Sequence, residues 1–192
     1  MKKAILIISA ICVAACALTA CNSSCGNEYK RLNSKLKEDY SQISITVNNT
    51  FTEEQITLTS VYTVKYAQNE ITVDYKVERF SEFTLESPVT DVKTTYEGSA
   101  SIVGGIISGG EEVGLTEDIA SLNLNFKKKN FENVTFNKTF FSADVKNTNS
   151  FLGVAECTDM HVVAGFDDKF KSITVSYKQG VNEVEYKYVF TN

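Results

Sequence analysis

The residues best suited to nucleophilic chemistry lie close together in the last quarter of the 192-residue chain. Cys157, Asp159 and His161 are spaced two residues apart, and His161 is the single histidine. In an extended strand, side chains two residues apart point to the same face. Because parallel side chains on one strand do not converge on a substrate, we expect no enzyme activity from a thiol, carboxylate and imidazole placed this way.

Metal-dependent and carboxylate chemistry have little support in the sequence. A zinc site needs three or four ligands, and one histidine with one nearby cysteine falls short. Acidic pairs occur at Glu111-Glu112, Glu117-Asp118 and Asp167-Asp168, in segments that we expect to be loops or turns. None has EF-hand spacing, so we expect solvated carboxylates, with a surface Ca²⁺ site as the alternative. Glycoside hydrolysis stays open, although the chain has no tryptophan for a sugar platform. We therefore expect no metal and no cofactor.

A glycine-rich segment between Gly98 and Gly114 is the second distinctive stretch. It contains the run Ile102-Val103-Gly104-Gly105-Ile106-Ile107. Glycine pairs disfavour the interiors of helices and strands. A phosphate-binding loop does not fit, since no Lys-Ser/Thr follows and the spacing of a nucleotide fingerprint is absent. The segment is interpreted as a packed loop, a mobile apolar flap over the core, or a bent strand pair. Exposed aliphatic side chains of a flap would contact a ligand or a membrane.

The N-terminal residues have the pattern of a secretory signal. Lys2 and Lys3 precede an apolar run from Ala4 to Leu18, and then come small residues, a cysteine and a polar stretch. A positive start, a short apolar region and a small-residue cleavage site are typical of such signals. The segment from Ala4 to Ala20 is shorter than the roughly 20 residues of a membrane-spanning helix. A signal that is cleaved without lipidation is the other alternative.

The tetrapeptide Leu18-Thr19-Ala20-Cys21 resembles the lipobox of bacterial lipoproteins. The resemblance implies that the Cys21 sulfur receives a diacylglyceryl group and that a peptidase cuts between Ala20 and Cys21. Acyl chains such as palmitate contribute about 0.8 kcal/mol per buried methylene, and two or more of them give stable anchoring. Val13-Ala14-Ala15-Cys16 also fits the pattern, but cleavage there would leave an apolar stretch in the mature chain. The resemblance thus implies export across the cytoplasmic membrane and a lipid anchor at Cys21 on the extracytoplasmic face.

Length and charge limit the partners of the remaining chain. Removal of residues 1–20 leaves 172 residues, which is about one domain and enough to bury a substantial core. Without Lys2 and Lys3, 17 basic residues face 24 acidic ones, a net charge of −7. Negative charge steers a protein away from nucleic acids and anionic headgroups. We expect no nucleic-acid partner, and membrane attachment through acyl chains rather than through charge.

Two cysteines remain once Cys12 and Cys16 leave with the signal and Cys21 is acylated. Cys25 and Cys157 could form one disulfide in an oxidising compartment. Cys25 lies in residues 21–27, which we expect to be a short lipidated tether, so Cys157 as a buried small hydrophobe is the alternative.

The periodicity of the chain predicts one helix followed by strands. Over residues 28–40, Tyr29, Leu32, Leu36 and Tyr40 form an apolar stripe at helical spacing, and Asn27 could cap the helix start. From Ser41 onward apolar and polar residues alternate, as in antiparallel strands with one buried face. The expected strands lie at 43–47, 57–66, 71–78, 92–96, 122–126, 134–136, 140–145, 160–166, 173–177 and 184–190, with a brief helix at 150–155.

These elements predict one mainly β (α+β) domain over residues 28–192. We expect a single antiparallel, strongly curved sheet or half-barrel of about eight to eleven strands, with one N-terminal helix packed on it. The order of elements is similar to that of half-barrel lipoprotein carriers typified by LolA and LppX. Two smaller cystatin-like halves, divided near residues 105–114, are the alternative.

Two functions are compatible with this architecture. The first is a membrane-anchored, non-catalytic binding module for an apolar small molecule or a protein partner. The second is a structural or surface-interaction lipoprotein with a filled core, and a Cys/His-dependent hydrolase is a third. The first two differ in whether the inward residues line a void or interdigitate. A cavity above about 300 Å³ favours binding, whereas ordinary interior packing favours a structural role. The inward residues in question are Tyr62, Val64, Val73, Tyr75, Val175 and Tyr186.

Overall fold

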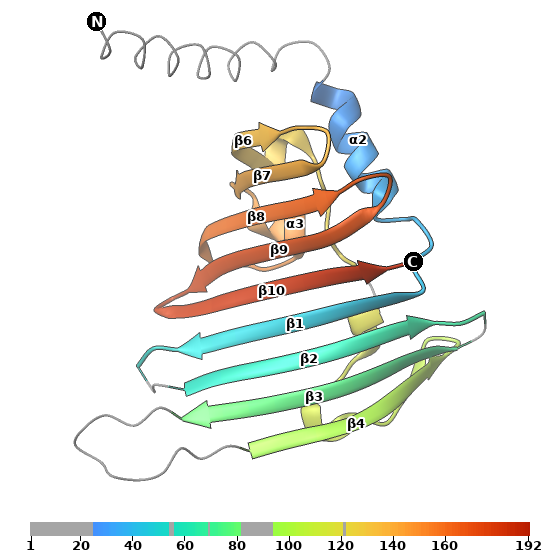
Figure 1. Cartoon of the computed structure of the whole chain (residues 1–192). Coiled ribbons are helices and arrows are strands. Elements are labelled where there is room, and N and C mark those ends of the chain that lie inside the picture. The colour runs from blue at the N-terminus through green and yellow to red at the C-terminus, as the bar shows by residue number, and fades with distance from the viewer. Residues whose placement is uncertain (1–24, 54–55, 69, 82–93, 121) are drawn as a thin grey trace, which may run out of the picture.

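The computed structural model describes residues 25–53, 56–68, 70–81, 94–120 and 122–192. In this part of the chain ten strands form one sheet, accompanied by two α-helices and three short 3₁₀ turns (Figure 1). The strands are β1 (Gln42–Phe51), β2 (Ile56–Tyr66), β3 (Ile71–Ser81), β4 (Thr94–Val103), β5 (Ile106–Ser108), β6 (Phe131–Phe136), β7 (Phe140–Val145), β8 (Thr158–Phe166), β9 (Phe170–Gln179) and β10 (Asn182–Thr191). The helices and turns are α2 (Cys25–Lys35), α3 (Thr148–Leu152), η1 (Glu111–Val113), η2 (Glu117–Ala120) and η3 (Lys128–Asn130).

The sheet is antiparallel throughout, with the strand order β5-β4-β3-β2-β1-β10-β9-β8-β7-β6. Each half of the chain forms a meander, and the two meanders meet where β1 pairs with β10. The predicted mainly β fold with one curved, unclosed antiparallel sheet is therefore confirmed, and ten strands fall within the expected number. The alternative of two separate halves is wrong, because the β1–β10 ladder is continuous from Gln42 to Thr50.

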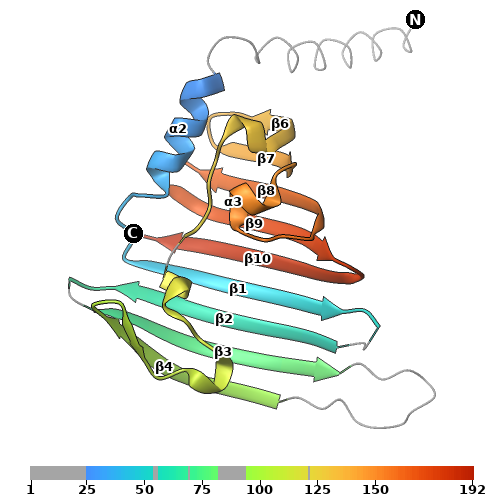
Figure 2. The same cartoon turned by 180° about the vertical axis from the view of Figure 1, so that it is seen from behind.

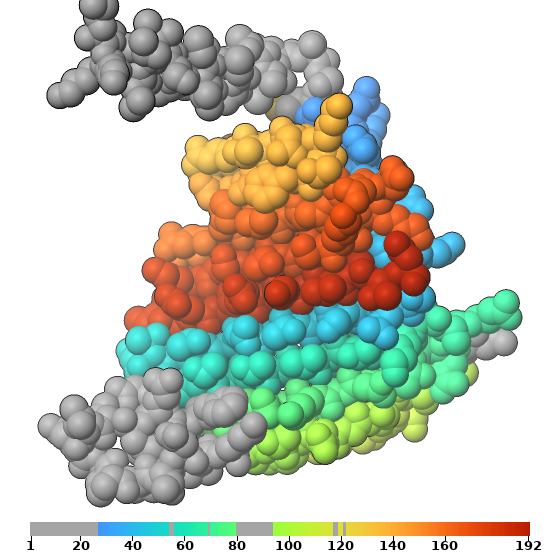
Figure 3. Space-filling view, in the orientation of Figure 1, coloured from blue at the N-terminus to red at the C-terminus, as the bar shows by residue number. Residues whose placement is uncertain are grey.

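The two faces of the sheet differ in character because side chains alternate along each strand. In β1, Ile43 and Ile45 are buried at 2% and 4% exposure, whereas Ser44 and Thr46 between them face the other side. The buried residues of the other strands join the same core. Ser44 and Thr46 lie on the opposite face, which no helix of the described residues covers (Figure 3). The core consequently lies on one face only, which we call the inner face; the other is the solvent face.

Helix α2 is shorter than the expected helix and begins earlier. It spans Cys25–Lys35 rather than residues 28–40, so it starts within the expected tether. Tyr29 and Leu32 are buried, and the Tyr29 ring stacks on Phe131 with centroids 5.9 Å apart. Tyr40 is also buried, but it lies beyond the helix and donates a hydrogen bond to the Lys35 carbonyl (2.7 Å). The apolar stripe continued past the helix because the following coil packs on the same core.

A long crossover (residues 109–130) connects β5 at one edge of the sheet to β6 at the opposite edge (Figure 2). The strand expected at 122–126 is wrong, since this segment is extended but joins no ladder. The Asn125 amide donates to the Phe151 carbonyl and the Phe126 amide to the Asn33 side chain, both at 3.0 Å. Leu124 and Phe126 are nevertheless buried. An extended chain lying on a core buries every second side chain, which explains the misleading alternation.

Phe126 fixes the crossover to the core. Its ring is 1% exposed and lies 5.4–6.0 Å, centroid to centroid, from four other phenylalanine rings. The four are Phe131, Phe141, Phe151 and Phe170. One crossover side chain therefore contacts β6, β7, α3 and β9 together.

Two tyrosine hydroxyls bind the first part of the crossover to the sheet. Tyr75 on β3 donates to the Glu112 carboxylate, and this bond raises the pKa of Tyr75 and lowers that of Glu112. Tyr66 on β2 donates to the Ala120 carbonyl at 3.0 Å. Gly98, opposite Tyr75 on β4, leaves room for the ring, since a Cβ there would lie 2.4 Å from the Tyr75 hydroxyl oxygen.

The glycine-rich run forms a tight strand pair, one of its three sequence interpretations. Gly104 and Gly105 have φ of 60° and 82° in the two-residue connection between β4 and β5. Positive φ at both positions is typical of a type I′ hairpin turn and is unstrained for glycine. Ile102 is buried and Ile107 is half-buried, whereas Val103 and Ile106 are 53% and 75% exposed.

The expected signal (residues 1–20), the cleavage and lipidation residues Ala20 and Cys21, and Val92 lie outside the described residues. Among the residues that are described, no helix is long and apolar enough to cross a membrane.

We predict that Phe126→Ala lowers the free energy of unfolding by about 3–5 kcal/mol, because it removes the ring at the centre of the aromatic cluster and leaves a cavity. Urea denaturation followed by circular dichroism measures this. Tyr96→Ala, at a side chain that is 47% exposed, is the control and should cost less than about 1 kcal/mol. Equal losses in the two variants would contradict the central position of Phe126.

We also predict that Tyr75→Phe loosens the crossover at η1. Loss of one hydrogen bond of about 1 kcal/mol should accelerate cleavage after Glu111 or Glu112 by a glutamate-specific protease about fivefold. Gly98→Ala should act in the same direction, since it displaces the Tyr75 ring. Gly165→Ala is the matched control, because its Cβ would meet only the Ser172 hydroxyl, at an ordinary 3.4 Å. Unchanged cleavage in Tyr75→Phe would show that this bond does not hold η1.

Candidate functional site

A cleft of about 280 Å³ lies between the crossover and the inner face of the sheet. Strands β1, β2 and β10 supply its floor, the crossover supplies its roof, and the segment after helix α3 closes one side. Its lining residues are Ile45, Tyr62, Gly114, Leu115, Thr116, Ile119, Asn123, Leu152, Val154, Tyr186 and Tyr188.

A row of three tyrosine rings lies on β9 and β10, and the two on β10 belong to the cleft floor. Tyr186 stacks on Tyr188 and on Tyr177, with centroids 6.3 Å apart and planes within 15° of parallel. Burial raises the pKa of Tyr188 well above its ordinary value of 10, and the neighbouring Tyr186 adds to the effect. The Tyr188 hydroxyl therefore stays protonated at physiological pH and can donate a hydrogen bond.

The described side chains that line the cleft include no aspartate, glutamate, lysine, arginine or histidine. Its polar groups are the tyrosine hydroxyls, the Thr116 hydroxyl and the Asn123 amide, and its remaining side chains are aliphatic. Binding sites for small molecules typically combine an apolar lining with a few hydrogen-bonding groups. Since a charged ligand would find no counter-ion among these side chains, the cleft suits an uncharged, mainly apolar one.

Of the six inward residues named in the sequence analysis, four are packed in the core and two line the cleft. Val64, Val73 and Val175 are completely buried, and Tyr75 is 6% exposed. Tyr62 and Tyr186 are half-buried and line the cleft. The inner face is thus packed over much of its area, and the cleft opens beneath crossover residues 114–116, 119 and 123. At about 280 Å³ the cleft falls just below the volume of about 300 Å³ above which a cavity favours binding.

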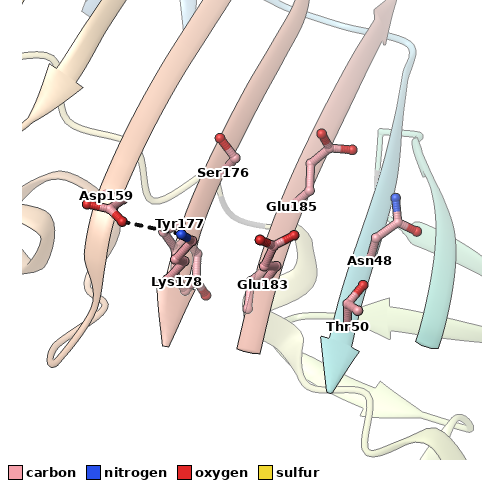
Figure 4. A pocket seen from close by; sticks show the side chains of 9 residues that line it. Asn48, Thr50, Asp159, Ser176, Tyr177, Lys178, Glu183 and Glu185 are labelled. Atoms are coloured by element: carbon pink, nitrogen blue, oxygen red, sulfur yellow. Dashed lines mark ion pairs between the residues drawn. The ribbon is translucent and has the colours of Figure 1, made fainter. Parts of the chain in front are cut away.

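Two other hollows have a more polar lining. One, of about 320 Å³, lies at the ends of β1, β9 and β10 (Figure 4). Glu183, Glu185 and an ion pair between Asp159 and Lys178 (3.7 Å) give it a charged rim. Another, of about 850 Å³, lies between α2, the crossover and α3, and asparagines supply much of its lining. Water satisfies such groups readily, so neither hollow favours an apolar ligand.

The structure does not bring Cys157, Asp159 and His161 together. Cys157 is half-buried, packs against the core and forms no disulfide within the described part of the structure. Asp159 has a φ of 54°, lies in an irregularity of the β8–β9 ladder, and pairs with Lys178. This irregularity interrupts the alternation that the sequence interpretation assumed. Helix α2 starts at Cys25, whose side chain lies outside the described part, so the Cys25–Cys157 disulfide stays a prediction.

His161 instead bonds two residues of the neighbouring strand, on the solvent face. Its Nδ1 lies 2.7 Å from the Asp144 Oδ1, and its Nε2 lies 2.9 Å from the Ser142 Oγ. The Asn133 amide donates to the second oxygen of Asp144 at 2.7 Å. These bonds, first that from Asn133 and then that from His161, lower the pKa of Asp144. We call Ser142, His161 and Asp144 the β7–β8 cluster.

Sequence reasoning missed this cluster because it depends on strand register. Asp144 lies directly opposite His161 in the β7–β8 ladder, and Ser142 is two residues away on the same face. The sequence predicted a strand at residues 140–145 but did not single out Ser142 or Asp144. Nothing in the sequence indicated which residue of the next strand would face them.

The acidic pairs serve other contacts. Glu112 accepts the bond from Tyr75, and Asp167 pairs with Lys171. The side chains of Glu117 and Asp118 lie outside the described part of the structure. Among the described residues, no group of three or more histidine, cysteine, aspartate or glutamate side chains is arranged to hold a metal ion.

Comparison with known protein families and curated proteins found no match for this chain: no family model matches it, and no curated protein matches it significantly.

Proposed function

We propose that this protein is an extracytoplasmic lipoprotein, anchored by acyl chains at Cys21, that binds an uncharged, mainly apolar small molecule. The observation that carries the binding proposal is the cleft beneath the crossover, whose described lining consists of tyrosine, aliphatic, threonine and amide side chains without a charged one. The anchor rests on the signal pattern and on Leu18-Thr19-Ala20-Cys21.

The shape of the cleft supports a ligand with one flat side. Tyr186 and Tyr188 present nearly parallel rings, and aromatic rings stack on other flat groups at such spacings. The Thr116 and Asn123 side chains could bond a hydroxyl or carbonyl of the ligand, which would fix its orientation. A fatty chain alone would leave these polar groups unpaired.

A structural or surface-interaction lipoprotein with a filled core is the second candidate. The observation in its favour is the close packing of Val64, Val73 and Val175, each with no exposed surface. The two candidates give opposite results when the cleft is filled by substitution.

We predict that the protein binds the uncharged dye N-phenyl-1-naphthylamine at least about tenfold more tightly than its sulfonated analogue 1-anilinonaphthalene-8-sulfonate. The sulfonate would find no counter-ion among the described side chains of the cleft, and burial of an unpaired charge is costly. Fluorescence titration of the purified protein measures both affinities.

Filling the cleft is the matched test of where the dye binds. Ile119→Trp places a large ring in the roof of the cleft and should weaken binding of the uncharged dye about tenfold or more. Val181→Trp, at an exposed position in the β9–β10 turn, should leave the affinity unchanged. Binding that survives Ile119→Trp, or no binding in the parent, would favour the structural candidate.

For the anchor, we predict that Cys21→Ser abolishes the added mass of the acyl groups and releases the protein from membranes. Acyl chains provide the attachment, since the net charge of −7 expected after cleavage does not favour anionic headgroups. Intact-mass analysis and membrane fractionation measure the outcome. Cys16→Ser is the control and should be processed and retained normally. A Cys21→Ser protein that remains as membrane-bound as its parent would refute the anchor.

A further inference from the structure

We propose that Ser142 is a nucleophile that accepts an acyl group from an ester, with His161 as its general base and Asp144 as a positioning residue. This activity would be separate from ligand binding in the cleft, because the β7–β8 cluster lies on the opposite face of the sheet.

The hydrogen bonds assign distinct roles to the two imidazole nitrogens. Asp144 is held in its ionised form by the bonds it accepts, so the Nδ1–H of His161 donates to its carboxylate. The Nε2 of a neutral imidazole then carries the lone pair. This nitrogen faces the Ser142 hydroxyl at 2.9 Å, where it can accept the proton. Base and nucleophile therefore have the contact that serine activation requires.

The sheet holds the β7–β8 cluster in place from beneath. Ala143 lies between Ser142 and Asp144 on β7, is completely buried, and faces Val162 beside His161 on β8. On the edge strand β6, Asn133 has a φ of 50° within a register shift, and its amide bonds Asp144. Bulges of this kind re-aim side chains, often beside active sites. A four-residue chain of bonds thus runs from Asn133 to Ser142.

The reaction follows from these contacts. The Ser142 Oγ bonds to the ester carbonyl carbon while its proton passes to the His161 Nε2. The bond from that carbon to the leaving oxygen then breaks, and His161 returns the proton to the departing alkoxide. Water then attacks the acyl-serine carbonyl carbon while His161 takes one of its protons. The bond from that carbon to the Ser142 Oγ breaks, His161 returns the proton to the Oγ, and the acid leaves. Thr135 lies opposite Ser142 on β6, and in the described part of the chain its hydroxyl makes no hydrogen bond, so it can donate to the developing oxyanion.

The location of the cluster defines the class of substrate. His161 and Asp144 have side chains that are 41% and 45% exposed, and neither they nor Ser142 line the hollows described above. An open, flat site has no pocket to enclose a substrate. It suits an acyl ester that protrudes from a larger molecule, and a small activated ester would serve as a probe.

The test is hydrolysis of p-nitrophenyl acetate by the full-length protein, with peptide mapping of the acetyl group. The Ser142-dependent rate is the difference between the parent and Ser142→Ala. His161→Asn should reduce this rate by about 100-fold or more, since a positioned base contributes that much. Asp144→Asn should also reduce it, while circular dichroism stays that of the folded parent. Ser176→Ala is the matched control, because Ser176 lies opposite His161 on the other flank, and it should leave the rate unchanged.

An acetyl group on Ser142 that forms in the parent and in Ser176→Ala, but not in His161→Asn, supports the proposal. It is overturned if Ser142→Ala hydrolyses the ester as fast as the parent, or if the Ser142-dependent rate persists in His161→Asn. Neither result bears on the cleft, whose test is dye binding on the opposite face.

Discussion

The inner face of the sheet is far wider than either described α-helix can cover, and much of the structure follows from that mismatch. Ten strands spaced about 4.8 Å apart span about 43 Å. The 11 residues of α2 extend for only about 16 Å. Apolar side chains on the rest of the face would remain in water unless another segment lay across them. The crossover is that segment, and its path from one edge of the sheet to the other is what allows so large a single sheet to have a core.

The crossover packs on the inner face unevenly, and the cleft lies where this packing is less close. Near β6–β9 the aromatic cluster around Phe126 packs the crossover tightly onto the sheet. Near β1–β3 the hydroxyls of Tyr66 and Tyr75 bond the crossover, and its apolar side chains such as Leu115 and Ile119 are only partly buried against the core. Polar bonds at isolated points fix a segment without filling the space beneath it. The same chain therefore provides a packed core at one end and an apolar cleft beside it.

The fold was largely predictable because one-sided burial produces a strong period of two. The strands, their antiparallel order and the single sheet followed from alternation such as that in Ile71–Ser81. The errors came where packing without strand pairing produced the same pattern. Leu124 and Phe126 alternate with polar residues in an extended segment that lies on the core but pairs with no strand. Tyr40 continued a helical stripe in coil, because its hydroxyl bonds Lys35 and Phe170 at the end of α2.

The candidate sites were less predictable, since they depend on which strands become neighbours. Tyr62 and Tyr186 were recognised as inward residues, but the roof of the cleft comes from a crossover whose path no local pattern encodes. His161 was recognised as the one available base. Its partners Ser142 and Asp144 became visible only with the β7–β8 register.

The position of α2 has a consequence for how the protein would stand on a bilayer. The helix begins at Cys25 beside the β6 edge of the sheet (Figure 1), only four residues after the proposed acylated cysteine. Four residues reach at most about 14 Å, even when fully stretched. A linker this short would hold the domain close to the lipid, with the β6 edge of the sheet nearest the surface and the other strands successively farther from it. The β4–β5 hairpin would then lie at the edge of the sheet farthest from the membrane. Its exposed Val103 and Ile106 would therefore lie away from the headgroups.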